Sequence, residues 1–203
     1  NFTRLQPHSK NIRMDKAENY INKYLSQVKE ICDQIDVGSI KSLIAGLQQL
    51  KKEQGRLFIL GVGGSAANAS HCVNDFRKIL QIEAYAPTDN VAELTARIND
   101  DSWDSCFSEW LKGSRLNKKD ALLIFSVGGG SDYTSQNIVE AIKLAKKVDA
   151  KIFSVVSRTG GYSKAFSDAC VLIPTPDRGL ITPHAEEWQG VVWHLLVNFK
   201  YED

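Results

Sequence analysis

The feature that most constrains the fold of this chain is an apolar run that ends in a loop of glycine and serine, and it occurs twice. Continuous apolar runs of strand length lie within residues 56–61 and 121–126, and the loops 61–67 and 126–131 follow them directly. A continuous apolar run is typical of a strand that is buried on both faces, as in a parallel sheet. Each loop leads straight into a stretch with helical spacing, so both segments predict a strand, a tight turn and a helix.

Further strands and helices are predicted along most of the chain. Apolar spacing predicts helices over residues 14–32, 38–52, 132–148 and 162–166 and strands over residues 151–156 and 169–173, and residues 80–85 are a candidate strand. Residues 1–13 are polar and predict an irregular lead. Thr182 and Pro183 predict the N-cap and the first residue of a last helix that reaches about Lys200. Strands that alternate with helices predict a doubly wound α/β sandwich with parallel pairing.

Length and composition exclude several classes of protein. A chain of 203 residues with 43% hydrophobic and 24% charged residues has the composition of about one globular domain. We expect a helical lead over residues 1–55 and one domain over residues 56–203. The formal net charge of +1 argues against a general nucleic-acid or membrane binder. The chain shows no secretory signal pattern or membrane-length apolar run, and its four cysteines form no CxxC pair, so we expect a cytoplasmic protein with free thiols.

Both loops have the composition of an anion site. Glycine lets the backbone approach a ligand closely, and a helix N-terminus offers unpaired N–H groups. Ser65 and Ser131, at the predicted helix starts, can cap the helix or donate a hydroxyl to a phosphate. A tight turn with a capping serine explains either loop alone. Two such loops after neighbouring strands favour a ligand site, because open α/β sheets bind ligands at the carboxyl edge.

The two loops also indicate which class of phosphate compound would bind. No lysine follows the first loop, which argues against a P-loop ATPase. A dinucleotide site is an alternative, because Gly61, Gly63 and Ala66 fit a G-x-G-x-x-A pattern and Glu83 follows at a suitable distance. That pattern leaves the second loop unexplained, whereas a monophosphate held between two loops uses both.

Residues 61–71, Gly-Val-Gly-Gly-Ser-Ala-Ala-Asn-Ala-Ser-His, resemble the G-N-G-G-S-x-x-x-A-x-H motif of sugar isomerase (SIS) domain proteins on the phosphoheptose isomerase branch. Residues 126–131 take the place of that branch's phosphate loop, and Asn99-Asp100 resembles its Gly-Asn-Asp segment. Glu186 to His194 matches its Q-x7-H pattern with Glu in place of Gln. The resemblance covers about residues 57–200. It implies a three-layer sandwich around a mainly parallel five-stranded sheet, with N- and C-terminal helices that assemble a homotetramer.

The resemblance also implies a reaction, namely the isomerisation of sedoheptulose 7-phosphate to D-glycero-D-manno-heptose 7-phosphate through a cis-enediol. The alternative is a SIS domain that binds a sugar phosphate as a sensor, or bridges proteins, without catalysis. The implied acid–base residues are Asp75 and His194, and the implied ligands of Zn²⁺ or another divalent ion are His71, Asp75, Glu186 and His194. The implied substrate-binding residues are Gly63, Gly64, Ser65, Asn99, Asp100, Ser126, Gly128, Ser131 and Glu186.

The residues themselves support this chemistry in part. His71 and Asp75 are four residues apart, so they share one face of a helix and can bind one ion. Glu186 and His194 are about 12 Å apart along a continuous helix, so they reach one ion only if Glu186 bends inward or different subunits contribute. Each residue also has an ordinary structural explanation: both histidines can be packed side chains, Asp75 a solvent-facing acid, and Glu186 an acid that favours a helix N-terminus.

Several positions depart from the family pattern. Val62 stands in place of the family Asn, and Val127 and Gly128 replace a Thr and a Ser. Asp75 is one methylene shorter than the usual Glu. Glu186 adds a charge where the family has an amide. These changes fit a different sugar phosphate, a retuned isomerase or a lost activity.

Overall fold

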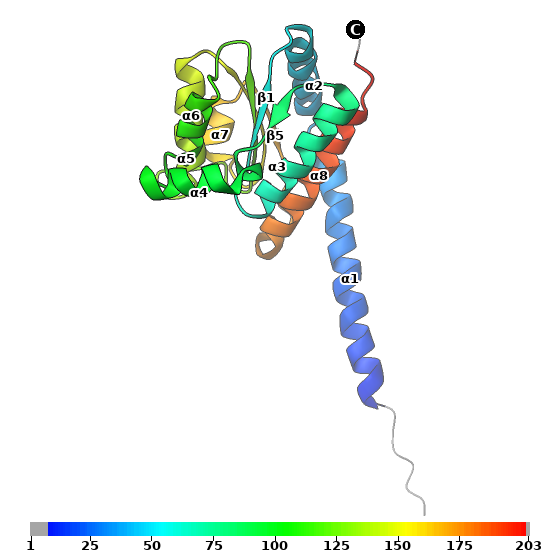
Figure 1. Ribbon diagram of the computed structural model, residues 1–203. Helices are drawn as coiled ribbons and strands as arrows, with labels where there is room; N and C mark the ends of the chain where they lie inside the picture. The colour runs from blue at the N-terminus through cyan, green and yellow to red at the C-terminus, as the bar shows by residue number, and fades with distance from the viewer. Residues whose placement is uncertain (1–7, 202–203) are drawn as a thin grey trace, which may run out of the picture.

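The computed structural model describes residues 8–201 of the chain, with side-chain positions from residue 15 onward. Its centre is a sheet of five strands, all paired in parallel, in the order β2-β1-β3-β4-β5 (Figure 1). The strands are β1 (Leu57–Leu60), β2 (Ala84–Tyr85), β3 (Ala121–Ser126), β4 (Lys151–Val156) and β5 (Ala169–Leu172). The predicted doubly wound, five-stranded α/β sandwich is therefore confirmed. The candidate strand at residues 80–85 shrinks to Ala84–Tyr85, because Leu80 still belongs to the π-helix η1 (Phe76–Leu80).

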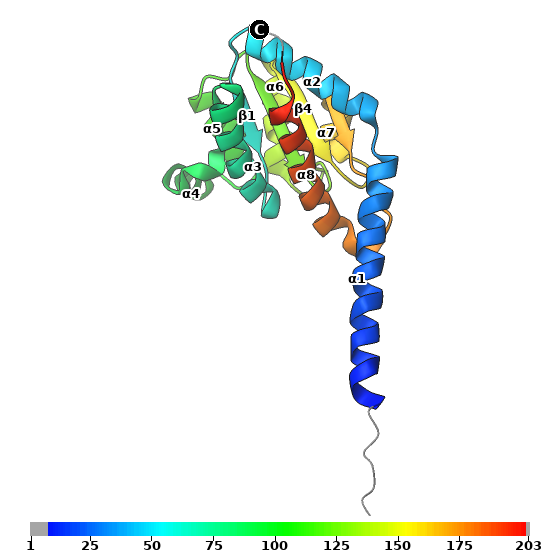
Figure 2. The same ribbon diagram turned by 90° about the vertical axis from the view of Figure 1, so that its right-hand side faces the viewer.

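Helices cover both faces of the sheet and make three layers. One face carries α2 (Val37–Lys52), α3 (Gly64–Asp75) and α8 (Ile181–Asn198), which share a core with the inward side chains of β1, β3, β4 and β5 (Figure 2). The other face carries α5 (Cys106–Gly113) and α6 (Gln136–Lys147), which pack on Phe58, Leu122 and Ile152. The remaining α-helices outside α1 are α4 (Val91–Asp100), near α5, and α7 (Gly161–Phe166), beside β4. None of the helices in the described part of the chain is long and apolar enough to span a membrane.

The first helix, α1 (His8–Gln34), extends away from the body of the domain (Figure 1). It starts within the lead that was predicted to be irregular over residues 1–13, so that prediction is wrong for residues 8–13, and residues 1–7 lie outside the described part. Near its C-terminal end, Ile31 is fully buried in the core. Lys23 Nζ lies 2.8 Å from Asp177 Oδ2 and connects α1 to the turn before α8. Hydrogen bonds from Lys23, from the Gly179 backbone and from Gln27 lower the pKa of Asp177 to about 2.

Two further predicted helix starts are wrong, and local hydrogen bonds explain one of them. The helix predicted from residue 132 begins at Gln136, because residues 131–135 close their own turn: Ser131 N donates to Thr134 O at 3.0 Å, and the two hydroxyls lie 3.0 Å apart. The last helix, α8, begins at Ile181, so Thr182 lies inside it and is not its N-cap.

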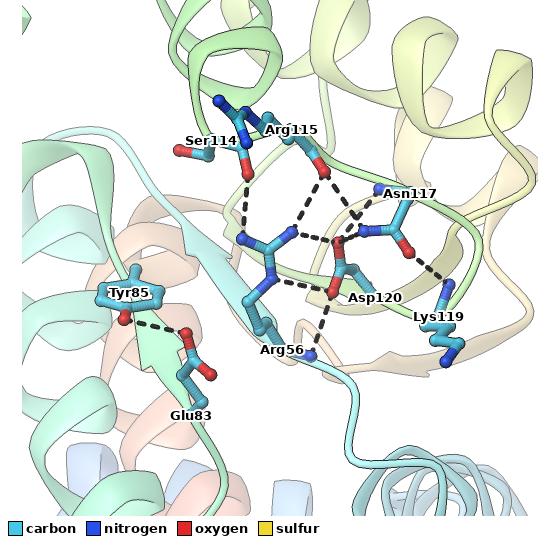
Figure 3. A network of polar contacts seen from close by, with 8 residues as sticks. All are labelled: Arg56, Glu83, Tyr85, Ser114, Arg115, Asn117, Lys119 and Asp120. Atoms are coloured by element: carbon cyan, nitrogen blue, oxygen red, sulfur yellow. Dashed lines mark hydrogen bonds and ion pairs between the residues drawn. The ribbon is translucent and has the colours of Figure 1, made fainter.

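An ion pair between Arg56 and Asp120 organises the amino end of the sheet (Figure 3). Arg56 Nη2 and Nε donate to the two Asp120 oxygens at 2.7 and 3.1 Å, and Arg56 Nη1 donates to Ser114 O at 2.9 Å. Asp120 also accepts from the backbone N of Asn117 at 3.0 Å. The Asp120 carboxylate raises the pKa of the Arg56 guanidinium, mainly through their hydrogen bond. This network joins the starts of β1 and β3 to the end of α5.

Candidate active site

The two glycine–serine loops lie next to each other at the carboxyl edge of the sheet. They follow β1 and β3, which are neighbouring strands. The chain runs from β1 to β2 on one side of the sheet and from β3 to β4 on the other. Ligands of open α/β sheets typically bind at such a switch point. The prediction that the two loops follow neighbouring strands is therefore confirmed, and a ligand between them stays a prediction.

The first loop turns tightly into α3, and the carboxylate of Glu186, from α8, lies against the backbone of this loop. Gly63 has φ 65° and is the N-cap of α3, a conformation that favours glycine. A Cβ atom at Gly64 would lie 2.5 Å from Glu186 Oε2. Gly64 thus leaves room for the Glu186 side chain, which reaches across from α8.

Ser65 holds α3 against α8. Its side chain makes no capping bond to α3, so its predicted capping role is wrong. It is 2% exposed, and its hydroxyl accepts a hydrogen bond from Gln189 Nε2 at 3.0 Å. Gln189 Oε1 in turn accepts from Asn68 Nδ2 at 2.9 Å. The sequence signal for Gln189 was an amide among apolar neighbours on the inner face of a helix, and it was missed.

The second loop is braced from the turn after β4. A Cβ atom at Gly129 would lie 1.9 Å from Gly160 O, and Ser163 N donates to Gly129 O at 2.8 Å. Ser126 Oγ, which is buried, accepts from Gly129 N at 3.0 Å and so shapes the loop. Ser131 is exposed but lies five residues before α6, so its predicted place at the helix start is wrong. Gly128 has open space where a side chain would be.

Three predicted residues, one from α8 and two from α3, meet in a compact cluster. Ligand atoms of His71, Asp75 and His194 all lie within 4.8 Å of one another. His71 Nε2 and His194 Nε2 each lie 3.6 Å from the same oxygen, Asp75 Oδ2. The carboxylate side chain is 11% exposed, whereas the side chains of His71 and His194 are 58% and 51% exposed. The cluster is therefore anchored in the protein by Asp75 and open to solvent at its histidines.

Hydrogen bonds orient two members of the cluster. His194 Nδ1 lies 2.8 Å from Gly190 O. A carbonyl can only accept, so Nδ1 carries a proton, and Nε2 is the ring nitrogen that faces Asp75. Asp75 Oδ1 accepts from Asn74 Nδ2 at 3.0 Å, and Oδ2 accepts from Trp193 Nε1 at 3.1 Å. Two imidazole nitrogens and one carboxylate form a donor set that suits Zn²⁺.

Other predicted site residues lie elsewhere. Glu186 does not join the cluster within one chain: its carboxylate lies against Gly64, about 10 Å along α3 from His71 at the rise of a helix. The physical reason is the two helical turns between Glu186 and His194. Asn99 and Asp100 lie exposed at the end of α4, where Asn99 Nδ2 donates to Asp100 Oδ1 at 2.8 Å. Among the described residues, no hydrogen bond connects Asn99 or Asp100 to the loops or to the cluster.

Known proteins resemble this chain in sequence and in fold. The family model of the SIS domain matches residues 20–157. The chain is 27% identical to the phosphoheptose isomerase of Helicobacter pylori, over 88% of this chain and 93% of that protein. It is 30% identical to the phosphoheptose isomerase of a Nitratiruptor species, over 71% of this chain and 75% of that protein. The solved phosphoheptose isomerase of Neisseria gonorrhoeae has the same fold, with a TM-score of 0.77, 23% identity and coverage of 91% of this chain and 97% of that one.

Proposed function

The chain belongs to the SIS domain family, and we propose that it is an aldose–ketose isomerase that converts sedoheptulose 7-phosphate to D-glycero-D-manno-heptose 7-phosphate. The observation that carries this proposal is the convergence of two imidazole nitrogens on one buried carboxylate at the end of α3. A domain that only binds a sugar phosphate needs the two loops and has no use for this cluster.

The reaction moves a proton from C1 of the ketose to C2 of the aldose, so it needs a base and an acid that bracket these carbons. The Asp75 carboxylate is suited to remove the C1 proton, because hydrogen bonds to both oxygens hold it in place. His194 is suited to transfer protons at the substrate oxygens, because its ring is half-exposed and its Nε2 faces the cluster. These roles give the cis-enediol a proton donor and a proton acceptor side by side.

His71, Asp75 and His194 would also hold a divalent ion such as Zn²⁺. When bound, such an ion polarises substrate oxygens and stabilises the negative charge of the enediolate. Glu186 completes this set only from a different subunit, and we retain that arrangement as part of the proposal. Removal of the metal with a chelator should lower the turnover rate, and added zinc should restore it.

The phosphate group is proposed to bind at the second loop. Gly128 offers an open backbone, and Ser131, three residues further along the loop, is exposed. Ser126 acts indirectly, by holding Gly129 N. Asn99, Asp100, Gly63, Gly64 and Ser65 remain predictions as substrate-binding residues, and the burial of Ser65 favours a bracing role. We place the reaction in the cytoplasm, where the four free cysteines stay reduced.

We further propose that the protein assembles as a homotetramer through α1. Tyr20, Ile21 and Leu25 are more than half exposed on this helix. With neighbouring residues they line an apolar groove of about 380 Å³ between α1 and the start of α8. An exposed apolar groove of this kind is typical of a subunit interface.

Replacing Ile21 with aspartate should therefore dissociate the assembly, because a charge is costly to bury in an apolar contact. Light scattering coupled to gel filtration measures the mass. Asn22→Asp adds the same charge one residue along the same exposed helix and serves as the control. Assembly through α1 is wrong if the unaltered protein is a monomer, or if Ile21→Asp keeps the mass of the unaltered protein.

Turnover of sedoheptulose 7-phosphate, with and without zinc, tests the enzyme against the sensor. We expect formation of the aldose. If the sugar phosphate raises the melting temperature but no product forms in either condition, the protein is a sensor and the isomerase proposal fails.

A further inference from the structure

We propose that Trp193 is a positioning residue for the cluster of His71, Asp75 and His194. Its indole N–H holds the single carboxylate oxygen on which both histidines converge. The inference rests on the proposed function, because it assigns a role within the same site.

Asp75 Oδ2 is the atom at which the contacts of the cluster meet. This oxygen lies 3.6 Å from Nε2 of His71 and 3.6 Å from Nε2 of His194. Trp193 Nε1 donates to it at 3.1 Å. Within the described part of the chain, Trp193 is the one hydrogen-bond donor to this oxygen. The carboxylate can rotate about its Cβ–Cγ bond, and the indole on Oδ2, together with Asn74 Nδ2 on Oδ1, fixes which oxygen faces the histidines.

An indole is well suited to this task. Its N–H can only donate, so it cannot exchange roles with a substrate or take up a proton. Trp193 is 3% exposed, and its ring packs 5.8 Å from the ring of Phe125 in the core. A buried N–H needs a partner, and Asp75 supplies it. The two side chains therefore fix each other.

The same ring also contacts both histidines. Its centroid lies 5.3 Å from that of His71 and 4.7 Å from that of His194. One rigid side chain, rooted in the core, thus touches all three members of the cluster. Such supporting contacts hold ligand and catalytic groups in their working geometry. No role was assigned to Trp193 from the sequence.

Trp193→Phe tests this role, because it keeps an aromatic ring and removes the N–H. Trp188→Phe is a matched control: Trp188 is buried in the same core on the same helix, 6% exposed, and its indole makes no hydrogen bond among the described residues. We expect Trp193→Phe to lower kcat by about 10- to 100-fold with little change in KM, and to weaken zinc binding by a similar factor. Calorimetric titration of the substrate-free protein measures the zinc affinity. The control should change neither quantity.

A second measurement needs no altered protein at the site. In the unaltered protein, the indole ¹H–¹⁵N resonance of Trp193 should move when zinc is added, while that of Trp188 stays in place. An unmoved Trp193 resonance overturns the proposal, as does a Trp193→Phe protein that matches Trp188→Phe in kcat and in zinc affinity. If the unaltered protein shows no turnover, the isomerase proposal fails, whereas the zinc titration and the resonance still decide the role of Trp193.

Discussion

Replacing His194 with alanine, or Asp75 with asparagine, should each lower kcat by about 10²- to 10⁴-fold, which is the usual contribution of a positioned acid or base. Asparagine keeps the shape of Asp75 and an acceptor for Trp193, but it cannot take up a proton at neutral pH. His194 is half-exposed, so its loss leaves the core intact. Steady-state kinetics with sedoheptulose 7-phosphate measures the effect.

The same variants should still bind the sugar phosphate, because the second loop lies apart from the cluster in the sequence and is braced by the turn after β4. The rise in melting temperature on addition of the sugar phosphate reports this binding. Asn198→Ala, one turn further along α8 and exposed, is the control and should keep normal kinetics. Near-normal kcat in His194→Ala or in Asp75→Asn would refute the assigned roles.

Replacing Asp120 with alanine should lower the free energy of unfolding by about 3–5 kcal/mol, the usual cost of removing one partner of a buried ion pair. The Asp120 side chain is 3% exposed, and that of Arg56 is 25% exposed. The substitution leaves the guanidinium without its counter-charge. It also removes the acceptor of the backbone N–H groups of Arg56 and Asn117. Denaturation by urea measures the change.

A surface ion pair provides the comparison for this effect. Lys143 Nζ lies 2.7 Å from Glu140 Oε1, and these side chains are 52% and 38% exposed. Glu140→Ala should therefore change the free energy of unfolding by less than about 1 kcal/mol. If Asp120→Ala costs no more than Glu140→Ala, the network shown in Figure 3 does not stabilise the amino end of the sheet.

The strands could be predicted because their apolar runs are continuous, and four of the five lie where the pattern placed them. The start of α6 could not, because the hydrogen bonds between Ser131 and Thr134 compete with helix formation and leave no mark on hydrophobic spacing. The strand β2 is shorter than predicted for a similar reason. The helix after Asp75 continues through a π-turn to Leu80, and a π-turn has no simple sequence signal.

The candidate site, too, could be predicted from the sequence only in part. His71 and Asp75 could be paired from their spacing of four residues on one helix. Their meeting with His194 depends on how α8 packs on α3, so it required the family resemblance and then the structure. Glu186 lies beyond the first turn of α8, not at its N-terminus as predicted, and two turns separate it from His194. Trp193 and Gln189 were missed, because a buried aromatic or amide side chain in an apolar stripe looks like core.

The most direct test of the isomerase is the fate of the transferred proton. The protein is incubated in D₂O with sedoheptulose 7-phosphate, and the product is analysed by NMR. Proton transfer through an enediol by Asp75 and His194 predicts an aldose 7-phosphate that carries deuterium at C2, because the buried Asp75 carboxylate faces the half-exposed ring of His194 and a proton on the pair exchanges with solvent there. An aldose without deuterium would contradict proton transfer by solvent-exchangeable groups, and the absence of any aldose would contradict the isomerase itself.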